Sequence, residues 1–179
     1  MGYLSDNFGL YAELTVAQSL AYAARSQGLP SAQVATAVAR TAQQLGLKDK
    51  LQVKTGSLSR GQRQRVGIGQ AIIHAPQVLL LDEPASGLDP EARSALARVF
   101  RSLQARGMTL LVSSHILPEL ADICNKIGII ERGELIVNAD VEAVMKQVRR
   151  QTILNITVLE NQDKAIKLLD DHSSVEKVE

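Results

Sequence analysis

The apolar positions of the chain alternate between stretches with helical spacing and short continuous runs. Apolar residues three or four positions apart predict helices that begin near Thr15, Ser31, Ser59 and Pro90. Continuous apolar runs at 78–81 and 109–112 are typical of strands buried on both faces of a parallel sheet. Helices alternating with buried strands predict a layered α/β domain.

Helix ends are marked by residues that satisfy free backbone groups. Thr15 and Ser59 are each followed three residues later by glutamine, which is the spacing of a capping box. Ser31 is predicted to cap the second helix, and Asp89 to cap the helix that starts at Pro90. Glycines are predicted to end three helices, and these are Gly28, Gly46 and Gly107.

The pattern divides the chain into a main domain and an appendage. Residues 1–150 are predicted to form the α/β domain, in which 15–54 is purely helical and makes a separate helical lobe. A hairpin is expected around 131–134, followed by a helix over 141–150. Residues 151–179 are predicted to form a small, incomplete α+β unit, with a strand at 153–159, a helix at 164–169 and a strand near Val175.

Composition narrows the classes of protein. The chain has 179 residues, of which 45% are hydrophobic and 22% charged, so it can bury a core. A net charge of +1 predicts no nucleic-acid partner and no attraction to anionic lipid. The one cysteine excludes a disulfide within the chain and a Cys-rich zinc site. Neither a secretory signal nor a membrane-length apolar run is found, so we expect a cytoplasmic protein whose membrane contact is made through a partner.

Four polar motifs stand at the ends of the predicted elements. In chain order they are Leu-Ser-Arg-Gly-Gln at 58–62, Asp-Glu-Pro at 82–84, Ser-Gly-Leu-Asp-Pro at 86–90 and Ser-Ser-His at 113–115. A helix N-terminus such as the one after Ser59 binds phosphate through its free N–H groups. Ligands of α/β sheets bind beyond the carboxyl ends of strands, where Asp82, Glu83 and His115 are expected.

In this order and spacing the motifs resemble those of the ATPase subunits of ABC transporters, over residues 2–150. The resemblance implies a partial P-loop NTPase core that binds ATP and Mg²⁺. It assigns Asp82 to the Mg²⁺ shell, Glu83 to polarising the attacking water, and His115 to the γ-phosphate and that water. Asp6 is the second candidate for the metal shell, because it stands where family members often carry a longer, uncharged glutamine.

The same resemblance implies a head-to-tail dimer, here a homodimer. In the family, the helix start that corresponds to Ser59, Gly61 and Gln62 closes over the nucleotide held by the partner subunit. Asp89 would lie at the dimer seam and couple the two sites.

The amino-acid sequences at 9–16 and 113–120 resemble those of ATPase subunits of bacterial exporters whose permease is a separate chain. The resemblance implies an ATP-binding subunit on the inner face of the membrane that drives export through that permease, which the loop 7–14 and the helical lobe would contact. The permease would choose the substrate. Two alternatives remain open: a soluble ABC-type ATPase, and a non-catalytic module that lends its signature motif in trans.

One motif of the family is absent from the sequence. No Gly-x-x-x-x-Gly-Lys-Ser/Thr phosphate loop is present, and the nearest segment, Lys54-Thr55, lacks the required glycines. The family places this loop upstream of the matched region, so we expect an N-terminally truncated subunit. We also expect the isolated chain to be inactive, because the loop supplies most of the triphosphate binding.

The remaining polar residues have structural interpretations. His74 is predicted to end a helix, and Cys124 to be a small core residue. Gly67 and Gly69 are expected where close packing leaves no room for a side chain. The third helix is expected to carry a solvated basic face rather than a nucleic-acid patch, made by Arg60, Arg63 and Arg65.

Overall fold

The computed structural model describes residues 1–116, 120–150, 156–158, 160–170 and 172. By its contacts the chain divides into one unit of Met1–Glu142 and a second of Ala143–Glu179. The predicted boundary at residue 150 lies at the other end of the helix that spans this division. Each unit is described below by itself.

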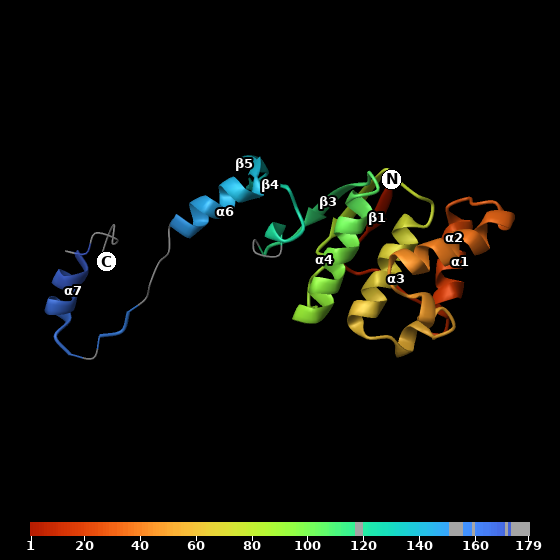
Figure 1. Ribbon diagram of the computed structural model, residues 1–179, viewed down its shortest axis with the longest axis horizontal. Helices are drawn as coiled ribbons and strands as arrows, with labels where there is room; N and C mark the ends of the chain where they lie inside the picture. The colour runs from red at the N-terminus through yellow and green to blue at the C-terminus, as the bar shows by residue number, and fades with distance from the viewer. Residues whose placement is uncertain (117–119, 151–155, 159, 171, 173–179) are drawn as a thin grey trace. The chain divides into compact units, whose positions relative to one another are not determined.

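The described elements follow the predicted alternation (Figure 1). In chain order they are β1 (Gly2–Leu4), α1 (Val16–Ser26), α2 (Ser31–Gln44), the 3₁₀ turns η1 (Lys48–Lys50) and η2 (Thr55–Ser57), α3 (Arg60–Ile72), β2 (Val78–Asp82), α4 (Pro90–Gln104), β3 (Thr109–Ser113), β4 (Lys126–Glu131), β5 (Glu134–Asp140), α6 (Val141–Arg150) and α7 (Gln162–Asp170).

The predicted capping of α1, α3 and α4 is confirmed. At the start of α1 the Gln18 amide donates to Thr15 Oγ1 at 3.2 Å, and the Thr15 amide donates to Gln18 Oε1 at 2.8 Å. Ser59 makes the same reciprocal pair at the start of α3. At α4, Asp89 Oδ1 accepts the amide of Ala92 at 2.8 Å, with Pro90 in the first turn. These helix starts are therefore fixed by local sequence.

The prediction that Ser31 caps α2 is wrong. Ser31 is the first helical residue, and Pro30 occupies the cap position with no side-chain hydrogen bond. The Pro30 carbonyl accepts the amide of Gln33 at 2.8 Å, so the helix begins one residue earlier than predicted. The proline ring fixes φ of Pro30, so the chain can begin the helix here without a hydroxyl that caps it.

A parallel sheet of three strands, in the order β1-β2-β3, forms the centre of the first unit. Leu4 pairs with Leu81, and Leu81 with Val112. Because the strands run the same way, their carboxyl ends lie at one edge of the sheet, as the α/β prediction requires.

The two faces of this sheet differ in burial. Leu4, Leu79 and Leu81 are buried in a core that includes residues of α3 and α4. On the other face Tyr3 is 59% exposed and Leu111 is 66% exposed. β2 and β3 were both predicted to be buried on both faces, and this prediction is wrong for β3. Successive residues of a strand face opposite sides of the sheet, and in β3 only one of these sides meets the core.

The helical lobe over 15–54 contains α1, α2 and η1. α1 and α2 contact each other and α3, and η1 contacts α2 (Figure 1). An antiparallel bridge joins its two ends, Thr15 and Lys54. The Lys54 ammonium lies 2.6 Å from Glu13, and the buried Thr55 hydroxyl donates to the Tyr11 carbonyl at 2.8 Å. The contacts of Lys54 and Thr55 thus stabilise the fold of the lobe.

The two glycines inside α3 mark close packing, as predicted. A Cβ added at Gly67 would lie 2.6 Å from the ring of Phe8. One added at Gly69 would lie 2.8 Å from Leu20 and 2.9 Å from Leu45. The glycines let α3 approach the lobe and the loop after β1 more closely than any side chain would allow.

The predicted hairpin is present as the antiparallel pair β4 and β5. In the second unit α7 (Gln162–Asp170) matches the predicted helix. The expected strand near Val175 lies outside the described residues, as does most of the one at 153–159, of which 156–158 are not in a strand. Among the described residues no helix is both long and apolar enough to cross a bilayer.

Candidate functional site

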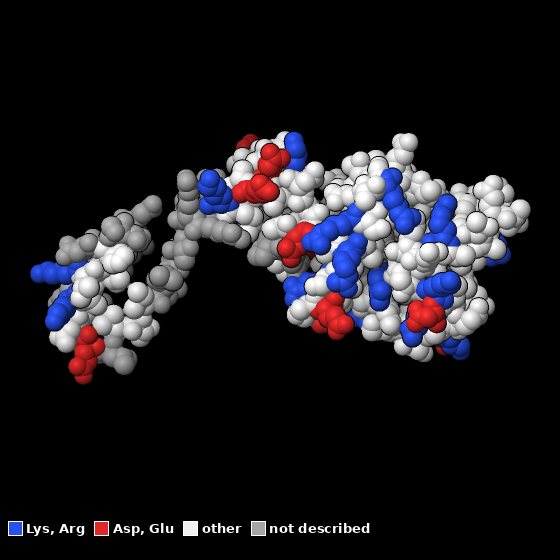
Figure 2. Space-filling view, in the orientation of Figure 1, with Lys and Arg blue, Asp and Glu red and all other residues white. Residues whose placement is uncertain are grey.

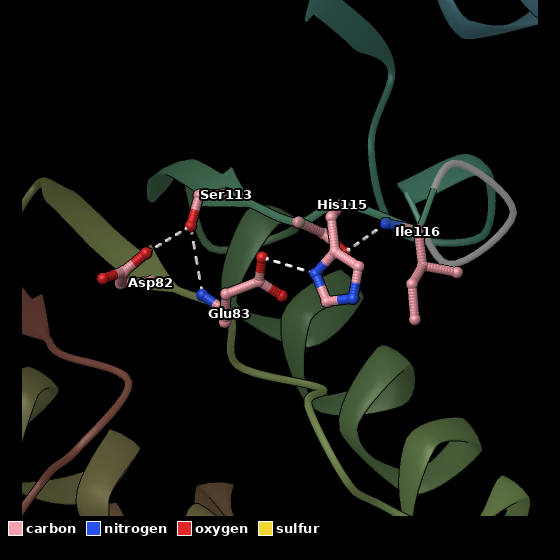
Figure 3. Close-up of polar contacts among 6 residues, drawn as sticks. Asp82, Glu83, Ser113, His115 and Ile116 are labelled. Atoms are coloured by element: carbon pink, nitrogen blue, oxygen red, sulfur yellow. Dashed lines mark hydrogen bonds and ion pairs between the residues drawn. The ribbon is translucent and has the colours of Figure 1, made fainter.

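Four polar side chains meet where β2 and β3 end (Figure 3). Asp82 is the last residue of β2 and is followed by Glu83, while Ser113 ends β3 and His115 lies two residues beyond it. Asp82 and Ser113 are paired in register, so their side chains share a face of the sheet. The sheet topology thus brings together the sequence-predicted residues Asp82, Glu83 and His115.

Glu83 and His115 form a direct carboxylate–imidazole pair. Glu83 Oε1 lies 2.8 Å from His115 Nδ1, as the dashed line in Figure 3 shows. The Glu83 side chain is 26% exposed and that of His115 is 71% exposed, so the pair lies at the surface but is partly shielded on the carboxylate side. Since a carboxylate only accepts, this geometry needs a proton on Nδ1.

Glu83 has an unusual backbone conformation. Its φ of 45° lies in the left-handed region, which non-glycine residues seldom adopt. The Glu83 amide donates to Ser113 Oγ at 3.1 Å, and its carbonyl accepts the amide of Ser86 at 3.1 Å. Strain of this kind persists where surrounding contacts fix it, and such positions cluster at functional sites.

Ser113 belongs to the site, but the sequence motifs gave it no role of its own. Its hydroxyl donates to Asp82 Oδ1 at 2.6 Å while it accepts the Glu83 amide. The signal was available, because the apolar runs that form β2 and β3 have equal length. Aligning their starts, Val78 with Thr109, places Ser113 opposite Asp82.

The start of α3 carries the residues that the resemblance assigns to a nucleotide held by a partner. Ser59 is exposed, and its Oγ accepts the Gln62 amide at 3.3 Å while Gln62 Oε1 accepts the Ser59 amide at 3.0 Å. A hydroxyl that accepts one hydrogen bond still has its own hydrogen to donate. A Cβ added at Gly61 would lie 2.8 Å from that of Ala92, so this glycine also permits the close contact of α3 with α4.

Arg60 connects the start of α3 with the loop that follows Glu83. Its guanidinium donates to the Ser86 carbonyl at 3.0 Å, and a Cβ added at the next residue, Gly87, would lie 2.6 Å from the guanidinium carbon. Gly87 has a φ of 64°, which favours glycine. Two motifs that are separate in the sequence are thus held together in one chain.

The predicted solvated basic face on α3 is wrong for two of its three arginines. Arg63 is half-buried and donates to the Leu58 carbonyl at 2.6 Å. Arg65 is half-buried and donates to the Leu45 carbonyl at 3.2 Å. These guanidiniums satisfy carbonyls at chain reversals, which removes them from the solvated surface.

The remaining predicted residues lie around the same edge. Asp89 is exposed and caps α4. Asp6 is exposed in the turn after β1, beyond the sheet edge at which β2 and β3 also end. Its predicted place in a metal shell stays a prediction.

Arg101 on α4 contacts Asp122, and other arginines of α4 lie beside it. Figure 2 shows basic side chains over this part of the first unit. A cavity of about 530 Å³ beside α4 is lined by Arg93, Arg98 and Arg101, with Ile116 and Asp122 on its other side. Arg101 donates to the Asp122 carbonyl at 2.8 Å, which holds Asp122 against α4.

Two polar residues predicted to be structural are packed in the first unit. His74 Nε2 lies 3.2 Å from the Met1 carbonyl oxygen. Partial burial raises the pKa of the Cys124 thiol above its ordinary value, because burial disfavours the thiolate. Cys124 therefore carries no charge at neutral pH.

Asp82 and Glu83 are the carboxylates at and just after the end of β2, where the resemblance to ABC ATPase subunits predicts a magnesium–nucleotide complex. No group of three or more His, Cys, Asp or Glu residues that could hold a metal occurs in the described part of the chain. Mg²⁺ in nucleotide sites takes one or two carboxylates and completes its shell with phosphates and water. Asp82 supplies a carboxylate of that kind.

Comparison with known proteins agrees with this arrangement. Residues 1–86 match the family described as "ABC transporter". This stretch includes β1, the helical lobe, α3 and β2, together with Asp82 at the end of β2 and Glu83 after it. The chain belongs to the ABC transporter ATP-binding family. The family fold is an α/β core with a parallel sheet, as the structure shows.

Family relatives include proteins for both resistance and import. The bacitracin transport ATP-binding protein BcrA of Bacillus licheniformis is 32% identical, over 100% of this chain and 57% of the relative. The linearmycin resistance ATP-binding protein LnrL of Bacillus subtilis (strain 168) is 30% identical, over 88% and 51%. The methionine import ATP-binding protein MetN of Myxococcus xanthus (strain DK1622) is 35% identical, over 81% and 44%. The chain therefore spans about half the length of these curated relatives.

Proposed function

We propose that this chain is part of an ATP-binding subunit that couples ATP binding and hydrolysis to transport through a separate membrane permease. The observation that carries the proposal is the Glu83–His115 pair at 2.8 Å, beside Asp82 at the carboxyl edge of a parallel sheet. Ligands of α/β sheets bind at this edge.

The roles of the strand-end residues follow from their chemistry. Glu83 acts as the carboxylate that polarises the attacking water, since it is partly shielded and presents an acceptor beside an imidazole. His115 keeps Nδ1 on Glu83 and, when protonated, can donate from Nε2 to a phosphate oxygen. Asp82, with Asp6 as a second candidate, would hold Mg²⁺, which neutralises phosphate charge.

A second copy of the subunit would complete each site. Ser59 is exposed at the start of α3, with the partly exposed Gly61 and Gln62 beside it, which supports their use on a nucleotide held by the partner. Asp89, exposed at the start of α4, would lie at the seam of such a homodimer. The Arg60 contact with Ser86 joins the two motifs within each copy.

The direction of transport and the location are part of the proposal. One of the three named relatives is a linearmycin resistance protein, which favours export. The loop 7–14 and the helical lobe would contact the permease, with the subunit on the inner face of the membrane. The substrate would be selected by the permease.

The test is the substitution Glu83→Gln in a complete ATP-binding subunit that contains this sequence. Because an amide cannot take a proton from water, we expect ATP turnover to fall by about 10²- to 10⁴-fold. ATP should then hold the subunit as a dimer in size-exclusion chromatography with light scattering. The matched control is Glu91→Gln, an exposed glutamate on α4, which should leave turnover unchanged. Unchanged turnover in Glu83→Gln would contradict the proposal.

A second candidate is a non-catalytic module that lends the start of α3 to a partner's nucleotide. It is favoured by the exposed Ser59, whose hydroxyl hydrogen is available for a partner's nucleotide. A soluble ABC-type ATPase is not favoured by any observation on the described residues.

A further inference from the structure

The Ser113 side chain connects the two acids at the end of β2. A serine hydroxyl has one hydrogen to donate and two lone pairs with which to accept. Here it donates to Asp82 Oδ1 at 2.6 Å and accepts the Glu83 amide at 3.1 Å. Figure 3 shows the hydroxyl between the Asp82 carboxylate and the Glu83 backbone. One atom of β3 thus contacts both acids.

The Glu83 backbone needs such a contact. Its φ of 45° is unfavourable for a residue with a side chain, and the turn sets the direction in which the carboxylate leaves the backbone. The amide is held by Ser113 and the carbonyl by the Ser86 amide at 3.1 Å. With both backbone groups held, the carboxylate reaches His115 Nδ1 at 2.8 Å.

The same strand end supplies the other half of the pair. His115 follows Ser113 by two residues, and Ser114 Oγ accepts the Ile116 amide at 3.1 Å, which turns the chain at this point. The end of β3 and the residues after it therefore contact Glu83 twice, at its amide through Ser113 and at its carboxylate through His115.

We propose that Ser113 is a positioning residue that fixes the left-handed turn at Glu83 and thereby presents the Glu83 carboxylate to His115. The proposal rests on the proposed function only in that the Glu83 carboxylate polarises the attacking water. The geometric claim concerns the chain without nucleotide, so it can be tested separately.

The experiment uses the isotopically labelled 179-residue chain and nuclear magnetic resonance. In Ser113→Ala we expect the Glu83 amide to exchange with solvent about 3- to 10-fold faster, as the loss of one hydrogen bond implies. The ring nitrogen shifts of His115 should move toward those of Glu83→Gln. Ser113→Thr keeps a hydroxyl and should restore both signals. The matched control is Thr109→Ala, which removes an exposed hydroxyl from the other end of β3.

Two results would overturn the proposal. One is faster exchange of the Glu83 amide with unchanged His115 ring shifts, since Ser113 would then only bond the strand end. The other is no change in either signal. If Ser113→Ala does not fold, Ser113→Cys, which is close in shape and a weak hydrogen-bonding group, replaces it with the same expected shifts. If the proposed function is wrong, Glu83→Gln will leave the ATP turnover of the complete subunit unchanged. That result would not alter the amide exchange or the ring shifts measured here.

Discussion

At the scale of single residues, the site depends on two kinds of position. At some the backbone has a left-handed φ, and at others neighbouring atoms leave no room for a Cβ. Glu83 is a non-glycine residue at a φ of 45°, and Gly87 follows at 64°. Gly61 and Gly69 have no room for a Cβ. The glycines set how closely α3 packs on its neighbours, and the conformation of Glu83 sets the direction of its carboxylate.

Gly69 gives a prediction at this scale. A Cβ there would lie 2.8 Å from Leu20 and 2.9 Å from Leu45, both fully buried side chains. Overpacking costs about 1–3 kcal/mol, and it should exceed the gain of about 1 kcal/mol in helix propensity. We expect Gly69→Ala to lower the free energy of unfolding, measured by urea denaturation.

The control for Gly69→Ala is Gly9→Ala, because a Cβ at Gly9 meets no atom within 4 Å. Its free energy of unfolding should change by no more than about 0.5 kcal/mol. A Gly69→Ala chain more stable than the wild type would show that the leucines move aside at little cost.

At the scale of elements, the sheet places the chemistry and packs on one face. β1, β2 and β3 are parallel, so their ends lie at one edge and bring Asp82 beside Ser113. The face that holds Leu79 is in the core, whereas the face that holds Leu111 is open on β3. Alanine substitutions on the two faces should therefore have different costs.

Leu79→Ala and Leu111→Ala test this difference. Leu79 has no exposed surface, so its truncation should lower the free energy of unfolding by about 2–5 kcal/mol. Leu111 is 66% exposed, and its truncation should change stability by no more than about 0.5 kcal/mol. Chemical denaturation of both variants measures the difference, and equal costs would show that both faces are covered in solution.

At the scale of the whole molecule, one unit carries all the proposed chemistry. Every predicted site residue, from Asp6 to His115, lies within Met1–Glu142. The chain has the acids and the histidine that we propose for hydrolysis, but its 179 residues contain no phosphate-loop motif to hold the triphosphate. Its net charge of +1 adds little general attraction for a polyanionic ligand.

We therefore expect the purified 179-residue chain to release no phosphate from Mg-ATP above background. The phosphate loop and its lysine provide most of the triphosphate binding, so the strand-end residues have no nucleotide to act on in cis. Phosphate release should be equal for the wild-type chain and Glu83→Gln, which serves as the control for contaminating ATPases. Turnover that Glu83→Gln removes would refute this expectation.

Local sequence was sufficient for most elements and for the identity of the candidate site residues. Capping boxes at Thr15 and Ser59 depend on residues three positions apart, so they form wherever the helix does. The same local signals failed at Ser31, where a proline carbonyl starts the helix without a hydroxyl. Glu83 and His115 were identifiable because the order and spacing of their motifs, at the ends of apolar runs, resemble those of ABC transporter ATPase subunits.

Tertiary structure alone decided the contacts that turn these residues into a site. Ser113 meets Asp82 across 31 positions of sequence, and Arg60 meets Ser86 across 26. Such contacts depend on strand register and on how closely α3 and α4 pack, neither of which is encoded in neighbouring residues. The burial of only one sheet face was decided in the same way, because an apolar run does not specify which of its side chains another element will cover.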